Sequence, residues 1–220
     1  MKKSTLWVLD LVVNVAVVVG TVLLIHFFLV APFDIYGSSM CDTMNLIDGE
    51  CTQEFGEKVV LNKAKYFVTE PERGDIVVFT PKHSDEKYFI KRVIGLPGET
   101  VEILNGEVYV TNDLNPRGTK LDEVYLNHEN KGRTYAKSTY SVFKVPEEEY
   151  FLLGDNREHS TDSRSCFDSS CKNGIDKAFI PKSLMEGKAW VSFWPISNWR
   201  VLDLPEYPEL TPVPTSPLEM

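Results

Sequence analysis

A lysine set among apolar residues is the first side chain in this sequence that could do chemistry. Lys91 lies in the run 88–94, whose alternation predicts a strand with Lys91 on the same face as Phe89 and Val93. Burial disfavours the ammonium form and lowers the lysine pKa from its usual value of about 10.4, which supplies more neutral amine to act as a base. The alternative is a lysine whose stem covers apolar surface while its head reaches water.

Two adjacent serines could provide the nucleophile. Ser38 and Ser39 follow Gly37 at the end of an extended run, where a tight turn can expose a hydroxyl. By themselves they fit a solvated linker, which is the commoner setting of a serine pair. The tripeptide at 73–75, Arg-Gly-Asp, is similarly open: it fits an adhesion motif or, more simply, a turn that leads into a hydrophobic strand.

A polar turn after a hydrophobic strand forms a third cluster. In residues 152–164, Ser160, Asp162 and Arg164 alternate, so an extended chain would point all three to one side. Asp162 could then pair with Arg164 while Ser160 offers a nearby hydroxyl. The structural alternative is a salt-bridged loop.

These residues need elements to position them, and the first is an apolar segment near the N-terminus. Residues 11–30 carry no charge and match the roughly 20 residues that a helix needs to cross a bilayer. A cleaved secretory signal would be shorter, and Pro32 stands where the cleavage site would end. Lys2 and Lys3 precede the segment and Asp34 follows it, so we expect a retained anchor with a cytoplasmic N-terminus and an extracytoplasmic remainder.

All four cysteines follow the apolar segment, on the side where disulfides persist. Proximity favours the pairs Cys41–Cys51 and Cys166–Cys171, although four cysteines allow three connectivities. A metal site is not expected, because the chain has no Cys-x-x-Cys and no paired ligand spacing among its histidines, which are His26, His83, His128 and His159.

After the apolar segment, short extended runs are separated by turn residues, a pattern that predicts a mainly β domain. The expected strands are 33–36, 58–62, 75–80, 87–94, 100–104, 107–110, 139–145, 150–153 and 189–193. Asn105-Gly106 predicts a two-residue hairpin turn, and 181–186 could form one helical turn. Residues 111–138 are polar and give no clear assignment.

The organisation that follows is an N-terminal anchor, one β-rich domain and a tail. We expect the cytoplasmic N-terminus and anchor in 1–32, the extracytoplasmic domain in 33–200 with an inserted, cysteine-bounded surface loop at 166–177, and a Pro-rich extended tail in 201–220. The 220 residues carry 32 acidic and 23 basic side chains, a net charge of −9. Nucleic acid is therefore not an expected partner, because no basic stripe could neutralise phosphates.

Taken together, the clusters resemble the successive sequence boxes of bacterial type I signal peptidases over roughly residues 5–195. The matching segments are Ser-Met at 39–40, Arg-Gly-Asp-Ile-Val-Val-Phe at 73–79, Lys-Arg-Val-Ile-Gly-Leu-Pro-Gly-Glu at 91–99, Gly-Asp-Asn-Arg at 154–157 and Asp-Ser-Arg at 162–164. The resemblance implies that Ser39 is the nucleophile and Lys91 the general base. It also implies that Ser160 hydrogen-bonds this lysine and that Asp162 and Arg164 form a bracing ion pair.

The same resemblance implies a fold and an activity. The fold would be the signal-peptidase β fold, related to that of repressor proteases, with one N-terminal transmembrane helix. The activity would be a membrane-bound serine endopeptidase that removes signal peptides by a Ser-Lys acyl-enzyme mechanism, without metal or cofactor. Its partners would be preproteins and the lipid bilayer of the cell membrane, and the enzyme would act as a monomer.

The chain departs from the family pattern at several points. Gly37 stands where some relatives carry a serine that helps to bind the oxyanion, Asp42 replaces a proline, and the segments 41–51 and 166–177 are cysteine-bounded additions. Two further functions stay open at this point. One is an inactive, membrane-anchored binding protein of the same fold, and the other is a self-cleaving Ser-Lys protease of the repressor type, which would need a DNA-binding segment.

Overall fold

A computed structural model describes residues 3–24, 29–41, 43–82, 87–168, 171 and 174–210. Asp42, part of the cysteine-bounded loop and residues 211–220 of the expected tail lie outside the described residues. The strands, in chain order, are β1 (Val30–Tyr36), β2 (Leu46–Ile47), β3 (Glu50–Cys51), β4 (Phe55–Asn62), β5 (Ile76–Phe79), β6 (Phe89–Gly95), β7 (Thr100–Leu104), β8 (Glu107–Thr111), β9 (Thr119–Lys120), β10 (Val142–Lys144), β11 (Glu149–Leu153), β12 (Phe179–Pro181), β13 (Met185–Trp194) and β14 (Arg200–Val201).

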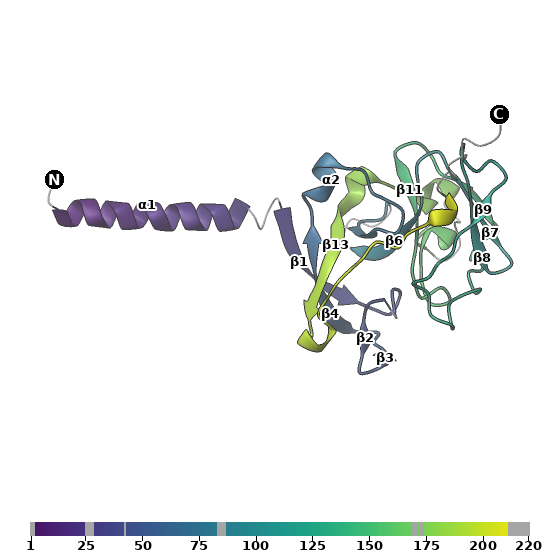
Figure 1. The fold of residues 1–220 in the computed structure, drawn as a ribbon, viewed down its shortest axis with the longest axis horizontal. Coiled ribbons are helices and arrows are strands. Elements are labelled where there is room, and N and C mark those ends of the chain that lie inside the picture. The colour runs from purple at the N-terminus through teal and green to yellow at the C-terminus, as the bar shows by residue number, and fades with distance from the viewer. Residues whose placement is uncertain are drawn as a thin grey trace, which may run out of the picture.

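The N-terminal helix α1 (Lys3–Leu24) extends away from the β-rich domain (Figure 1). Its described side chains, from Trp7 to Leu23, are exposed and almost all apolar. Within the described part of the chain, no helix is long and apolar enough to cross a membrane.

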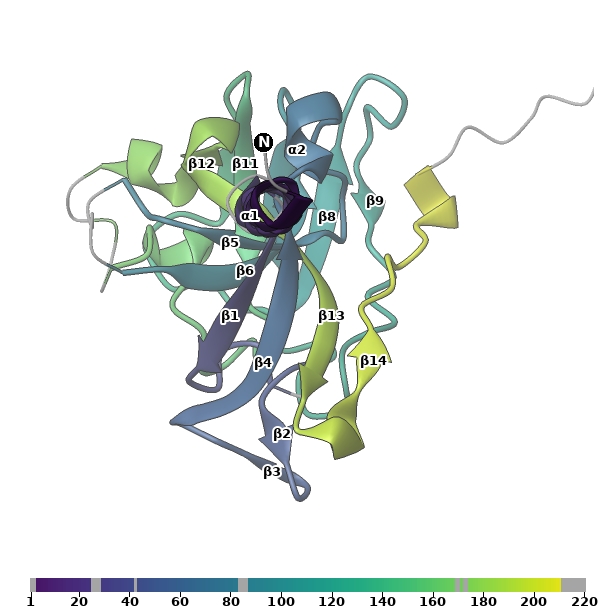
Figure 2. The same ribbon diagram turned by 90° about the vertical axis from the view of Figure 1, so that its left-hand side faces the viewer.

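Two antiparallel sheets build the domain (Figure 2). The larger sheet has the order β1-β4-β13-β5-β6-β11-β12, with β14 beside β13, and the smaller sheet has the order β10-β7-β8-β9. Hairpin β2-β3 forms a third, two-stranded unit. The mainly β prediction is confirmed, and β6 lies inside the larger sheet between β5 and β11, which buries both of its faces.

One hydrophobic cluster of the domain lies between the two sheets, and other clusters pack on the larger sheet. Ile94 and Phe151 of the larger sheet pack with Val101, Val110 and Phe143 of the smaller one. The hydrophobic effect favours each of these fully buried side chains by about 1.5–3 kcal/mol. The predicted turn at Asn105-Gly106 is present, since both residues have positive φ and β7 pairs directly with β8.

Helical turns account for the remaining regular structure. They are α2 (Lys65–Val68) and the 3-10 turns Ser163–Ser165, Ile175–Ala178, Lys182–Leu184, Ile196–Asn198 and Pro208–Leu210. The turn at Lys182–Leu184 falls within the helical turn expected at 181–186.

Two segments that the sequence suggested would be loose are packed where the structure describes them. Cys166 and Phe167 are buried, so the described part of the 166–177 segment is not a simple surface loop. Residues 201–210 are not a loose tail either, because Leu202 is buried and Tyr207 packs against the core. Apolar side chains spaced between the prolines and cysteines explain both differences.

Candidate active site

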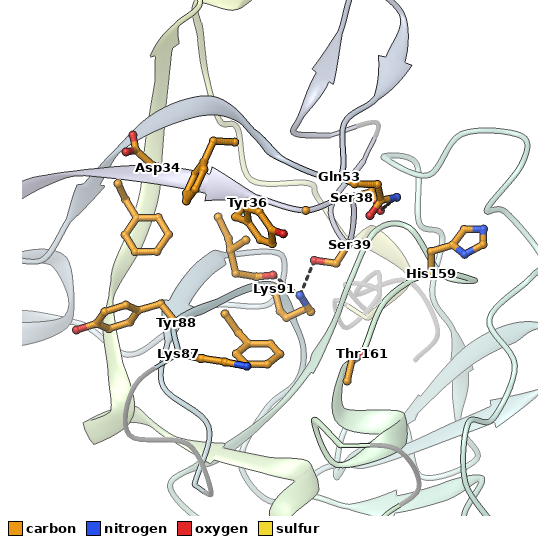
Figure 3. A pocket seen from close by; sticks show the side chains of 15 residues that line it. Asp34, Tyr36, Ser38, Ser39, Gln53, Lys87, Tyr88, Lys91, His159 and Thr161 are labelled. Atoms are coloured by element: carbon orange, nitrogen blue, oxygen red, sulfur yellow. Dashed lines mark hydrogen bonds between the residues drawn. The ribbon is translucent and has the colours of Figure 1, made fainter.

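The fold brings together the serine and the lysine that the sequence singled out. Lys91 Nζ lies 2.7 Å from Ser39 Oγ, although the residues are 52 positions apart in the chain (Figure 3). Ser39 lies in the turn that follows β1, and Lys91 lies near the middle of β6. This distance allows direct proton transfer between the two atoms.

The turn that carries Ser39 is held in place by its backbone. Gly37 has a φ of 82°, a conformation that favours glycine, and turns the chain out of β1. The amide of Cys41 donates to the carbonyl of Ser38 at 3.0 Å, which closes the turn around the serine. Asn156 then donates from its backbone to Ser39 O at 3.2 Å and from its side chain to Ser38 O at 3.1 Å.

Lys91 is buried down to its amino group. Only 2% of its surface is exposed, and Nζ also donates to the carbonyl of Ile90 at 2.7 Å. Burial lowers the pKa of Lys91 to about 8, although the carboxylates of Asp162 and Asp155 oppose this effect. The alternative in which the lysine head reaches water is therefore wrong.

A clamp of neighbouring residues fixes the lysine relative to the serine. Arg92, which follows Lys91, forms a buried ion pair with Asp155 and also donates to Gly74 O at 2.8 Å. Asp155 directly precedes Asn156, the residue that holds the turn of Ser39. Lys91 and Arg92, which are neighbours on β6, are thereby connected to the turn of Ser39 through Asp155 and Asn156, which follow β11.

The sequence also indicated Ser160, Asp162 and Arg164, and the structure places them beside this site. Arg164 binds Asp162 through two hydrogen bonds of 2.8 and 2.7 Å, and both side chains are fully buried. Burial acts to raise the pKa of Asp162, but the charge and hydrogen bonds of Arg164 hold it below its ordinary value. The chain is not extended here, because residues 163–165 form a 3-10 turn capped by Asp162.

The hydrogen bond expected between Ser160 and Lys91 is absent from the described structure. Ser160 is buried, and its Oγ packs so closely on Gly154 that a Cβ at that glycine would overlap it. Lys91 Nζ is instead directed to Ser39 and to the Ile90 carbonyl. Ser160 therefore lies next to the site, but its Oγ makes no hydrogen bond to the lysine in the described structure.

Sequence reasoning missed several residues around the site. Lys137 donates to the carbonyls of Glu158 and Ser160 at 2.8 and 2.6 Å, and Gln53 Nε2 donates to Ser38 Oγ at 2.7 Å. Lys137 belongs to the polar region that had no assignment, and Gln53 follows β3, which was not predicted. Neither has a local sequence signal, since each acts through contacts with distant segments.

Two other features bear on the sequence predictions. Arg73 and Asp75 are buried, so an adhesion role for the Arg-Gly-Asp tripeptide is wrong. The cysteines pair as Cys41–Cys51 and Cys166–Cys171. Among the described residues, no group of three or more histidine, cysteine or acidic side chains could hold a metal ion.

An open cleft of about 630 Å³ leads to Ser39 and Lys91 (Figure 3). In Figure 3, Tyr36 and Tyr88 lie on one side of the Ser39–Lys91 pair, and the ring of Phe33, which also lines the cleft, packs against Tyr88. The opposite side is more polar and includes Ser38, Gln53 and His159. The cleft can therefore hold an extended peptide that has an apolar stretch on one side of the reacting bond.

The buried pair Asp162–Arg164 yields a stability prediction. Arg164→Met should lower the free energy of unfolding by about 3–5 kcal/mol, because it leaves a buried carboxylate without its partner. The pair stabilises the fold above the unfolded pKa of Asp162, so this loss should shrink as the pH falls through the range where the carboxyl protonates. Urea unfolding of the full chain in detergent, followed by circular dichroism, measures both effects.

The matched control is Lys131→Met, which removes an exposed ion pair with Asp122. It should change the free energy of unfolding by about 1 kcal/mol at most. Equal losses in the two variants would contradict a special role for the buried pair.

Comparisons with known proteins show which family this chain resembles. The family model "Signal peptidase, peptidase S26" matches residues 8–194. The chain is 33% identical to signal peptidase I S of Bacillus subtilis over 90% of its own length and 94% of that protein, and 32% identical to signal peptidase IB of Staphylococcus aureus strain COL over 91% and 95%. A signal peptidase I structure from Enterococcus faecalis shares 30% identity, with a TM-score of 0.40 over 55% of this chain and 97% of that chain. The chain therefore belongs to the signal peptidase family, peptidase S26.

Proposed function

We propose that this peptidase removes signal peptides from exported preproteins with Ser39 as nucleophile and Lys91 as general base. The observation that carries the proposal is the 2.7 Å contact between Ser39 Oγ and a fully buried lysine amine. A serine hydroxyl is a weak nucleophile until a base takes its proton, and a neutral lysine can do so without histidine or metal.

The reaction proceeds in two halves. Lys91 Nζ accepts the Ser39 hydroxyl proton while Oγ attacks the scissile carbonyl, and the resulting ammonium returns the proton to the leaving amine as the peptide bond breaks. Lys91 then takes a proton from water as the water attacks the Ser39 ester, and it returns that proton to Ser39 Oγ as the acyl–oxygen bond breaks and the signal peptide is released. Asp162 and Arg164 act as positioning residues, and Ser160 supports them by packing rather than by binding the lysine.

The negative charge on the attacked carbonyl oxygen needs hydrogen-bond donors. The backbone N–H of Ser39 is one candidate, and we assign the second role to the Ser38 hydroxyl. Gln53 donates to Ser38 Oγ at 2.7 Å, which leaves the hydroxyl proton of Ser38 available for the oxyanion. Some relatives carry a serine at the position of Gly37. The glycine provides no hydroxyl there, and the structure leaves the space around it empty. In this chain the hydroxyl of the next residue, Ser38, would take that role.

We also propose that α1 anchors the enzyme in the cell membrane, with a cytoplasmic N-terminus and an extracytoplasmic β domain. Its exposed apolar side chains and the two lysines at the start of the chain support this arrangement. Ser39 follows the helix closely in sequence, so the site would meet preproteins while their signal peptides remain in the bilayer. Signal peptides with small residues before the scissile bond would suit the cleft, and one chain would suffice as a monomer because it carries both Ser39 and Lys91.

Removal of either reacting group tests the mechanism. Ser39→Ala and Lys91→Ala should each abolish cleavage of a preprotein in detergent, because the nucleophile or its base is lost. Cleavage is followed by gel electrophoresis, and circular dichroism reports the fold. The controls Ser197→Ala and Lys120→Ala change exposed residues and should cleave as the wild type does. Unchanged cleavage in either site variant would exclude the mechanism, as would cleavage lost equally in the controls.

The pH dependence follows from the lowered pKa of Lys91. The base works only when neutral, so kcat/KM should rise about tenfold per pH unit below the lysine pKa and level off above about pH 8. A pH series with a quenched signal-peptide substrate measures the midpoint. A midpoint near pH 10 would show that the amine is not buried in the working enzyme.

The oxyanion assignment predicts a separate effect at Ser38. Ser38→Ala should reduce kcat by about 10²-fold with little change in KM, because the lost contact forms mainly in the transition state. Ser38→Thr keeps the hydroxyl and should restore most of the rate. A Ser38→Ala enzyme with wild-type kcat would rule out this donor.

A further inference from the structure

A second hollow adjoins the cleft on its polar side. It has a volume of about 310 Å³ and shares three lining residues with the cleft, namely Ser38, Gln53 and His159. The Cys41–Cys51 disulfide forms part of its wall. The two hollows therefore meet along the Ser38–Gln53 hydrogen bond, next to the reacting serine.

The arrangement of the cleft indicates which part of a bound substrate would reach this second hollow. In Figure 3, Tyr36 and Tyr88 lie on one side of Ser39 and Lys91, while Gln53, Ser38 and His159 lie on the other. A peptide that places its apolar residues against the aromatic side and its scissile carbonyl at Ser39 continues past His159. The residues that follow the scissile bond then reach the second hollow.

The hollow is acidic, and most of its other polar groups are already engaged. Asn156 binds the Ser38 carbonyl, and Asn130 Oδ1 accepts from the Arg157 amide. Glu129 and Glu158 are exposed carboxylates on its wall. Their charges are only partly balanced. Among the described residues, Glu158 has a half-exposed ion-pair partner, Arg133 at 3.5 Å, and Lys137 donates to its backbone carbonyl, whereas Glu129 has no ion-pair partner.

We propose that this hollow, which we name the leaving-side hollow, binds the first residues of the mature chain and favours a basic over an acidic side chain there. The inference rests on the proposed function, since it needs the scissile carbonyl at Ser39. Glu129 and Glu158 determine the preference through their charge, and the shared wall of Ser38, Gln53 and His159 carries the peptide from one hollow to the other. Exposed charges of this kind change binding only modestly, so the preference is graded rather than absolute.

Three quenched peptides that differ at one position test the proposal. They share one signal-peptide sequence and carry Lys, Gln or Glu at the second residue after the scissile bond. With the full-length enzyme in detergent at low salt, kcat/KM should fall in the order Lys, Gln, Glu, with about a fivefold span between the extremes. Added salt should narrow the span, because it screens exposed charges.

Matched variants assign the effect to the hollow. In the double variant Glu129→Gln with Glu158→Gln, the ratio of kcat/KM for the Lys and Glu peptides should fall to about one. The control Glu186→Gln removes an exposed carboxylate on β13 and should keep the wild-type ratio.

Equal kcat/KM for the three peptides with the wild-type enzyme would overturn the proposal, as would an unchanged ratio in the double variant. Either result leaves the Ser-Lys mechanism intact if Ser39→Ala is inactive on all three peptides. Cleavage that persists in Ser39→Ala would overturn both proposals.

Discussion

The site depends on a lysine amine that is held out of water. An exposed lysine would be neutral at pH 7 only about once in two thousand molecules, so it could not serve as a base. In this protein, β6 lies between two other strands, and Lys91 points into the domain with its amino group between Ser39 and the Ile90 carbonyl. The energetic cost of that burial falls on the charged form, and the pKa drops to about 8.

Burying the lysine does not by itself place the serine. The backbone of the turn that carries Ser39 is held by Asn156, and the neighbouring Asp155 is fixed by a buried ion pair with Arg92. Thr43, a few residues after Ser39, also donates to Asp155 at 2.6 Å. Since Arg92 adjoins Lys91, the contacts form a closed circuit in which neither reacting group can shift without breaking a buried ion pair or hydrogen bond.

Buried arginine–carboxylate pairs recur around this circuit. Arg73 with Glu99, Arg157 with Glu123 and Arg164 with Asp162 are almost completely removed from solvent, as is Arg92 with Asp155. Such pairs add little net stability compared with apolar side chains, but losing one partner is costly. Their arrangement here connects loops that have few apolar residues, which suits a site that needs fixed polar geometry more than additional core.

Residue types and local sequence patterns were sufficient to predict several strands and turns of this protein and to single out its candidate site residues. The alternation around Lys91 predicted its strand, Asn105-Gly106 predicted the hairpin turn, and the order of the sequence boxes identified Ser39, Lys91, Asp162 and Arg164. These features are local because a strand face or a turn depends on a few consecutive side chains and on backbone conformation.

The tertiary structure decided which distant groups meet. It directed Lys91 to Ile90 O rather than to Ser160, placed Gln53 on Ser38, brought Lys137 from an unassigned region and packed Leu202 and Phe167 into the domain. Some of these contacts join segments that lie far apart in the chain, and no local sequence pattern predicts that they meet. Others depend on a side-chain rotamer that is set by packing. Hydrogen-bond partners and hollows arise from the assembled sheets, so the sequence could single out Ser39 and Lys91 but not the side chains that surround them.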